Sequence, residues 1–163
     1  MITHRKESAT MQFFTDLIQN PILMSAVIGW LIAQVLKTII HLIMTRQFVA
    51  ERLVGSGGMP SCHSSTVCAL TTATGMIYGV SGYEFAIACI LAIVVMYDAM
   101  GVRRAAGNQA KILNEMIDMF SHMGKNLSAH DTLKEFIGHT PIQVFAGAIL
   151  GIIIAIVVCT LMM

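Results

Sequence analysis

Two histidines in this chain lie in segments whose residues suit the binding of an anion. His63 falls within the stretch GSGGMPSCHSS, residues 55–65, where glycines permit a tight turn and a Pro-Ser pair opens a helix. A helix N-terminus presents unpaired N–H groups and a partial positive charge, which together favour an anion. His139 lies directly before another helix start, in the stretch GHTPIQ, residues 138–143. An ordinary capped helix start with an incidental histidine is the alternative interpretation of both segments.

Basic residues accompany these histidines. Lys37 is the only charged residue inside the first long apolar run, and it shares one helical stripe with Gln34 and His41. Ionisable groups within a membrane span are costly and usually face a bundle interior or a watery cavity. The alternative is that Lys37, eight residues from the end of its span, extends its ammonium to the lipid headgroups.

A third cluster of charge follows the third apolar run. Asp98 closes that run, and the tandem pair Arg103 and Arg104 comes directly after it. Guanidinium groups suit bidentate binding of phosphate. Paired arginines at a membrane edge also contact anionic lipid headgroups, and the sequence leaves both interpretations open.

Together these residues favour histidine-based phosphoryl chemistry, in which one imidazole attacks phosphorus and another protonates the leaving oxygen. Basic side chains and helix-end amides would stabilise the charge on the transferring group. No metal-ligand spacing is present, so we expect neither a metal nor a cofactor. The four cysteines form no C-x-x-C pair, and we expect them to be free thiols packed among helices.

The composition predicts the class of protein that positions these residues. Of 163 residues, 56% are hydrophobic and only 12% are charged, about half the charged fraction of a soluble domain. The net charge of +1 gives no case for a nucleic-acid partner. We expect one membrane-embedded domain over residues 1–163, with a polar tail at 1–19 that lacks the features of a secretory signal.

The apolar runs predict an all-α integral membrane bundle of about four transmembrane helices. The predicted spans are Pro21 to Thr45, Ser64 to Val80, Tyr83 to Val102 and Pro141 to Met163. Residues 103–138 are polar and predict an amphipathic interfacial helix followed by a surface hairpin. With so few spans, formation of a homo-oligomer would be one way to cover the bundle.

The distribution of basic residues predicts the orientation of the protein in the cell membrane. Four spans place both long polar connectors at the face that carries the histidines. These connectors contain Arg46, Arg52, Arg103, Arg104, Lys111, Lys125 and Lys134. The opposite face has only Arg5 and Lys6, so the positive-inside rule places the connectors in the cytoplasm and both termini outside.

Three stretches resemble the divergent branch of the phosphatidic acid phosphatase type 2 superfamily, which are membrane relatives of the vanadium haloperoxidases. GGMPSCHSS resembles the second motif of the superfamily, with Cys62 in place of a glycine. VMYDAMGVRRAAGNQAKILNE resembles a signature of the divergent branch itself. GHTPIQVFAGAILG resembles the end of the third motif, and the resemblance as a whole extends over roughly residues 20–158.

The resemblance implies a role for each matching residue. His139 would be the nucleophile that takes the phosphoryl group, and His63 would be the general acid. Ser61 would bind phosphate through its hydroxyl and amide, and Lys37 matches the lysine that opens the first motif.

Besides Cys62, the sequence departs from the superfamily pattern at three positions. Met44 and Leu133 occupy the places of two motif arginines, for which Arg103 or Arg104 is a candidate replacement. Gln143 replaces the aspartate that orients the nucleophilic histidine. A glutamine carbonyl can accept the imidazole N–H but cannot stabilise an imidazolium with a charge. Asp98 could supply the missing carboxylate if its helix end lies close.

The leading hypothesis is therefore a lipid-phosphate phosphatase that acts through a phosphohistidine. A cytoplasmic site favours a phospholipid phosphate such as a phosphatidylglycerol precursor, whereas an external site favours a polyprenyl phosphate. The alternative hypothesis is a non-catalytic binder or carrier of lipid phosphate that keeps the anion pocket. A structural bundle without a ligand leaves Lys37, His63 and His139 on one face unexplained.

Overall fold

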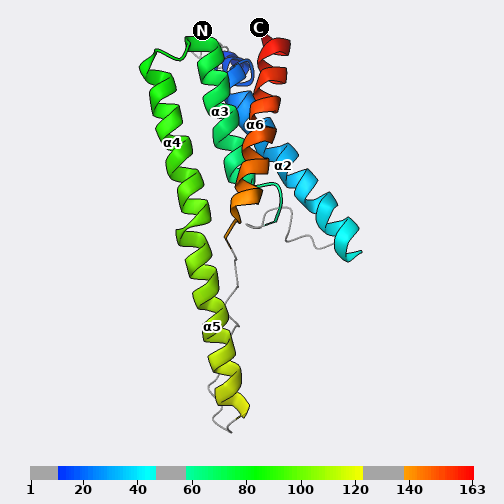
Figure 1. Cartoon of the computed structure of the whole chain (residues 1–163). Helices are drawn as coiled ribbons and strands as arrows, with labels where there is room; N and C mark the ends of the chain where they lie inside the picture. The colour runs from blue at the N-terminus through cyan, green and yellow to red at the C-terminus, as the bar shows by residue number, and fades with distance from the viewer. Residues whose placement is uncertain (1–10, 47–57, 123–137) are drawn as a thin grey trace, which may run out of the picture.

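The computed structural model describes residues 11–46, 58–122 and 138–163, without the side chains of 102–104 and 120–122. Within these ranges every regular element is a helix. Figure 1 shows a bundle of helices from which one long helix projects. The surface hairpin expected before the last span lies outside the described residues.

The first long helix, α2, covers Pro21–Thr45 and matches the predicted span. The side chain of Asn20 caps it, because its oxygen accepts hydrogen bonds from the backbone N–H groups of Ile22 at 3.0 Å and Leu23 at 3.1 Å. The helix ends at Arg46, whose φ of 55° is left-handed. The predicted Asn-Pro start signal is thus confirmed.

The second helix, α3, covers Cys62–Tyr78 and lies two residues earlier at both ends than the predicted Ser64–Val80. Ser61 is its N-cap, which leaves His63 in the first helical turn. The helix ends at Gly79, whose φ of 80° is a conformation that glycine adopts without strain.

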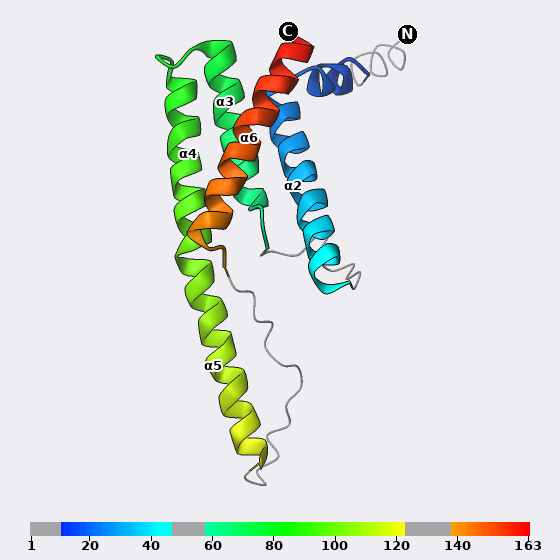
Figure 2. The same ribbon diagram turned by 45° about the vertical axis from the view of Figure 1, so that its right-hand side comes forward.

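The next two helices form one long rod. α4 covers Tyr83–Met100 and α5 covers Val102–His122, with only Gly101 between them. Figures 1 and 2 show α5 continuing nearly in line with α4 and running past the end of the bundle. Its amphipathic character is as predicted, whereas its location at the membrane interface stays a prediction.

The last helix, α6, covers Pro141–Met162 and begins with a capping box. The hydroxyl of Thr140 accepts from the backbone N–H of Gln143 at 3.4 Å, and the side-chain oxygen of Gln143 accepts from the N–H of Thr140 at 3.1 Å. This reciprocal pair satisfies two N–H groups that a helix start otherwise leaves without a partner.

α3 lies at the centre of the bundle and contacts α2, α4 and α6. Figures 1 and 2 show that α6 runs in the same direction as α3, whereas α2 and α4 run in the opposite direction. The starts of α3 and α6 therefore lie at the same end of the bundle. Many interior residues are small or carry a hydroxyl, as is typical where helices pack within a membrane. Those with no exposed surface include Ser61, Ser64, Ser65, Ala33, Ala69, Ala73 and Ala155.

Glycines allow α2 and α6 to pack closely against α3. A Cβ added at Gly29 of α2 would lie 3.3 Å from the carbonyl oxygen of Ser65. A Cβ at Gly147 of α6 would collide with the carbonyl of Ser61, and one at Gly151 with that of Ser65. The backbones of α3 and α6 consequently meet at a distance that no larger residue at these two positions permits.

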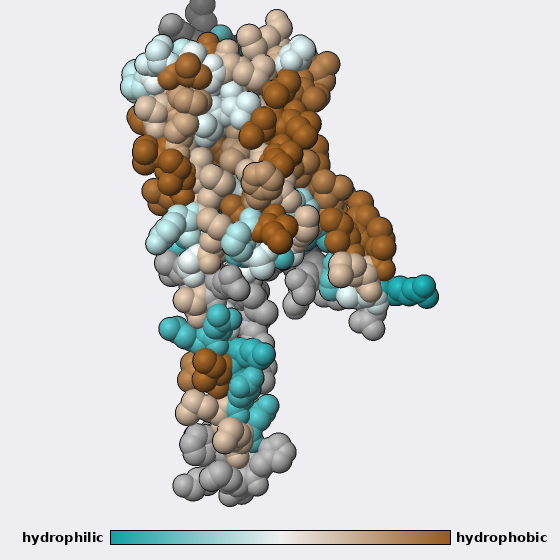
Figure 3. Space-filling view, viewed as in Figure 1, coloured by the Kyte–Doolittle hydropathy of each residue, from teal (hydrophilic) through white to brown (hydrophobic). Residues whose placement is uncertain are grey.

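The outer surface identifies the environment of the bundle. α2, α6 and the rod Tyr83–Met119 are long and apolar enough to cross a membrane. Figure 3 shows apolar side chains over the bundle and polar side chains along α5. The predicted membrane helical bundle is confirmed. Whether the shorter, threonine-containing α3 is a fourth crossing stays a prediction.

A short helical segment, residues 11–18, precedes α2 and was not distinguished within the polar tail. Figure 2 shows it turned sharply away from the axis of α2, at the end of the bundle opposite the start of α6. Its apolar side chains are exposed, notably Phe13, Phe14 and Ile18.

Candidate functional site

His139 is buried at the end of the bundle where α6 begins. It is only 2% exposed. Its backbone N–H donates to the carbonyl of Ala99 at 3.0 Å, which fastens the residue to the last turn of α4. Its ring nitrogen Nδ1 lies 3.2 Å from Oε1 of Gln143. Two helices therefore fix both the backbone and the ring of His139.

The capping box determines which ring nitrogen of His139 carries the proton. The N–H of Thr140 can only donate, so the Gln143 atom that it contacts at 3.1 Å must be the amide oxygen. That same oxygen faces His139 Nδ1, and an oxygen cannot donate to nitrogen. Nδ1 therefore carries a proton, and when the ring is neutral its lone pair is on Nε2. This is the tautomer that a nucleophile acting through Nε2 requires.

Ser61 joins the start of α3 to the start of α6. Its backbone N–H donates to the carbonyl of Gln143 at 3.0 Å. Its hydroxyl oxygen accepts from the N–H of Ser64 at 3.3 Å and from the hydroxyl of Ser64 at 3.1 Å. One residue thus caps α3 and positions that helix against the capping box of α6.

The two histidines predicted for phosphoryl chemistry are neighbours. The ring centroids of His63 and His139 are 5.7 Å apart, with the rings inclined by 66°. His63 is partly exposed, whereas His139 is buried. The sulfur of Cys62, which stands where the superfamily has glycine, lies 3.9 Å from His63 Nδ1. The two rings are therefore neighbours, and His63 is the more accessible of the two.

Lys37 belongs to the interior of the protein and does not extend to the outer surface. It is 2% exposed. Its aliphatic stem passes the turn before α3, where a Cβ added at Gly58 would lie 2.9 Å from Cγ of Lys37. A glycine at position 58 therefore lets the turn close over the lysine. The turn also has a left-handed φ of 85° at Gly58, which glycine accommodates readily.

The other predicted residues lie near this site along the chain. Asp98 immediately precedes Ala99, the residue that holds His139, and its side chain is half-buried. Arg103 and Arg104 lie in the first turn of α5, just past the same end of α4, and their side chains are outside the described set.

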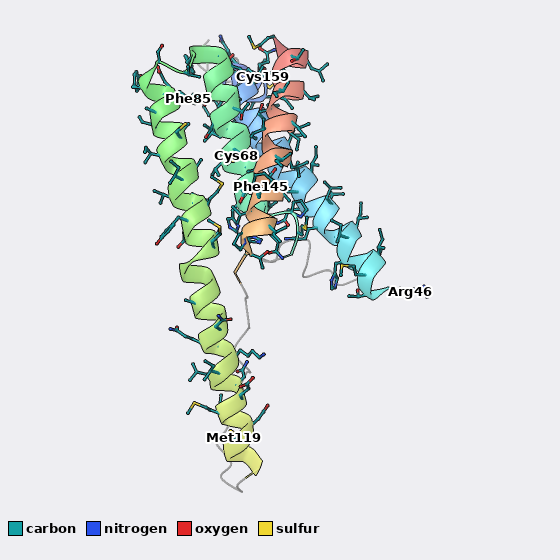
Figure 4. The ribbon with its side chains drawn as sticks, in the orientation of Figure 1. Arg46, Cys68, Phe85, Met119, Phe145 and Cys159 are labelled. Atoms are coloured by element: carbon teal, nitrogen blue, oxygen red, sulfur yellow. The ribbon has the colours of Figure 1, made fainter. Side chains whose placement is uncertain are left out.

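Of the two positions at which a motif arginine is missing, the structure describes only one, Met44. Met44 is 79% exposed and lies near the far end of α2. Arg46, labelled in Figure 4, also extends from that end, away from the start of α6. Arg46 thus does not replace the arginine, and Leu133 lies outside the described residues.

Two contributors to the site were missed from the sequence. Thr140 caps α6 and determines which end of the Gln143 amide faces His139. Its signal was present, since Thr-x-x-Gln before an apolar run is a capping-box pattern. Ser64 donates its hydroxyl to Ser61, and its signal is only the common spacing of three residues within a helix start.

The fold and the site define a helical membrane protein with two histidines and a lysine gathered at one end. The chain belongs to the Divergent PAP2 family, whose model matches residues 18–154. A similar protein is "Uncharacterized membrane protein YuiD" of Bacillus subtilis (strain 168), 36% identical over 151 residues that cover 87% of this chain and 96% of the relative. No solved structure matches the chain. The predicted family and the membrane location are confirmed.

Proposed function

We propose that this protein is a membrane phosphatase that hydrolyses the phosphomonoester of a lipid, a phospholipid or a polyprenyl phosphate. The observation that carries the proposal is the 5.7 Å separation of the His63 and His139 rings at a shared helix end. Membership in the Divergent PAP2 family supports it. A site at one end of a membrane bundle also suits a substrate whose phosphate lies at the headgroup level.

In the first step, Nε2 of His139 attacks phosphorus and the bond between phosphorus and the ester oxygen breaks. His63 donates its proton to that oxygen, so the lipid alcohol leaves as a neutral molecule. Gln143 keeps the N–H at Nδ1 of His139 oriented throughout. Lys37 and the N-terminus of α3 stabilise the negative charge of the phosphoryl oxygens.

In the second step, water attacks the phosphorus of the phosphohistidine. His63, now unprotonated, accepts a proton from that water, and the bond between phosphorus and Nε2 breaks. Inorganic phosphate leaves, and both histidines return to their starting states. The proton that His63 gives to the alcohol is replaced by the proton from the water, and the proposed mechanism requires no metal or cofactor.

One observation favours a second candidate, a binder or carrier of lipid phosphate without catalysis. The group beside Nδ1 of His139 is the neutral oxygen of Gln143 and not a carboxylate. Without a negative partner, the charge that His139 gains during attack is stabilised less. The anion-binding features would persist in such a protein while turnover was lost.

The test is phosphate release from a panel of lipid phosphates in detergent micelles. We expect the wild type to release phosphate, and His139→Ala and His63→Ala each to reduce kcat by at least about a hundredfold. His122→Ala, at the far end of α5, is the matched control and should retain full activity.

Two outcomes would contradict this proposal, one the activity itself and the other the role of His139. If no lipid yields phosphate while radiolabelled lipid phosphate still binds, the binder is correct. Turnover that persists in His139→Ala would remove His139 as the nucleophile. Trapping of labelled phosphate on the wild type, lost in His139→Ala alone, would give direct support to the covalent step.

A further inference from the structure

A buried amide lies one helical turn from Lys37, and its oxygen has no partner in the described part of the chain. The side chain of Gln34 on α2 is only 5% exposed, and its Oε1 makes no hydrogen bond to any described residue. A buried amide oxygen without a partner is costly, and native proteins contain few of them. Gln34 therefore needs a physical explanation.

The packing of α2 places Gln34 beside the proposed phosphate site. Gly29 of α2 lies against Ser65, and Lys37 lies against Gly58. The chain runs in opposite directions along these two segments, so Gln34 lies at the level of Ser61, the cap of α3. Gln34 and Lys37 are three positions apart, which puts both side chains on one buried stripe of α2.

The charges around Gln34 indicate which kind of ligand would form a hydrogen bond with its side chain. Lys37 and the N-terminus of α3 both favour an anion. A half-turn of the Gln34 side-chain amide exchanges its oxygen for its N–H group, which can donate to a phosphoryl oxygen. A neutral donor at this depth adds a hydrogen bond without adding another charge to bury.

We propose that Gln34 is a phosphate ligand of the site, on the bundle side of Lys37. It would provide part of the binding that the superfamily obtains from the arginine replaced by Met44, which is 79% exposed and remote. This inference rests on the proposed function, because it needs a phosphate between α2 and the start of α3. The buried amide of Gln34 then destabilises the protein while no phosphate is bound, and a bound phosphate removes that destabilisation.

The test separates binding from folding by using three variants of the full chain in detergent and inorganic phosphate as the probe. In Gln34→Met, of nearly equal volume, we expect phosphate affinity to fall about tenfold. The melting temperature without phosphate should stay the same or rise, because the unbonded amide is gone. Gln34→Glu should lose measurable phosphate binding through repulsion, and Gln12→Met, exposed on segment 11–18, is the matched control.

Each contrary result has a distinct meaning. If the wild type binds phosphate and Gln34→Met binds it equally well, the role of Gln34 is wrong and the phosphatase proposal stands. A lower melting temperature of Gln34→Met would identify a structural residue instead. Retained binding in Gln34→Glu would show that the side chain at position 34 does not contact the phosphate. A wild type that binds neither inorganic nor lipid phosphate would overturn this inference and the proposed function together.

Discussion

At the scale of the residue, Gln143 has two tasks that a single oxygen fulfils. Its Oε1 accepts from the backbone N–H of Thr140 and faces Nδ1 of His139. The superfamily pattern has an aspartate at this position, so the chain retains the geometry of the contact and loses its charge. That loss affects the imidazolium formed during attack more than the neutral ring before it.

Gln143→Glu would restore the charge without moving the acceptor. A glutamate fits the capping box as well as glutamine does, so α6 should begin unchanged. The carboxylate would stabilise the imidazolium that His139 forms during attack, so we expect kcat to rise on the order of threefold. The same carboxylate favours the protonated ring before attack, so the acid limb of the pH–rate profile should move to higher pH.

The profile of phosphate release against pH checks this expectation, with Gln143→Met as the comparison. Methionine removes both hydrogen bonds, so its activity should fall well below that of the wild type. An acid limb that stays in place in Gln143→Glu would show that Oε1 does not face His139 during turnover.

At the scale of the element, the register between α3 and α6 brings the two histidines together. Gly147 and Gly151 let α6 approach the carbonyls of Ser61 and Ser65. The close approach allows the N–H of Ser61 to reach the carbonyl of Gln143 at 3.0 Å. The arrangement of the site thus depends on two positions that take no part in its chemistry.

Gly147→Ala should therefore disturb the site from a distance. The added methyl group meets backbone and not a flexible side chain, so α6 must move away from α3. We expect a loss of about 1–3 kcal/mol of stability and a large fall in kcat. Melting in detergent and phosphate release measure the two effects.

The control for Gly147→Ala enlarges α6 on its outer face. Ile153 is exposed there, and Ile153→Phe should change neither the melting temperature nor kcat. A Gly147→Ala protein that melts and turns over like the wild type would show that the two helices are not held at this distance.

Local signals explain which parts of the elements could be predicted. The Asn20 cap, the start of α6 and the glycine after α3 all lie within a few residues of the helix end that they define. The start of α3 at the Pro-Ser pair was likewise predicted, although the predicted span began two residues later, at Ser64. The collinearity of α4 and α5 could not be predicted, since a glycine between helices also permits a turn.

For the site, the histidines and Lys37 could be proposed from residue type and a motif, but their mutual distances could not. The contact of Ser61 with Gln143 joins residues far apart in the chain, and neither segment signals the other. The stripe that Gln34 shares with Lys37 favoured an inward-facing position, and both residues are buried, but the sequence could not show which segment they face.

At the scale of the whole molecule, the orientation in the membrane decides which lipids can reach the site. The predicted cytoplasmic face rests on seven basic residues against two at the other end. The rod of α4 and α5 carries α5 beyond the bundle at the site end, where Figure 3 shows polar side chains. The turn at Tyr83 marks the opposite end.

Labelling of single cysteines in a cysteine-free chain tests this orientation. Lys111→Cys on α5 should react with a membrane-impermeant maleimide only after the cells are permeabilised. Tyr83→Cys should react in intact cells, because its exposed turn is predicted to face outward. The reverse pattern would place the site outside and favour a polyprenyl phosphate as the substrate.

The shared oxygen of Gln143 also has a consequence for the newly made protein. The ring of His139 is oriented only when the first turn of α6 has formed, and α6 follows α2, α3 and α4 along the chain. A chain in which α2, α3 and α4 have inserted but α6 has not formed therefore lacks an oriented ring at His139. In the proposed enzyme, hydrolysis of membrane lipids begins only after α6 has joined the bundle.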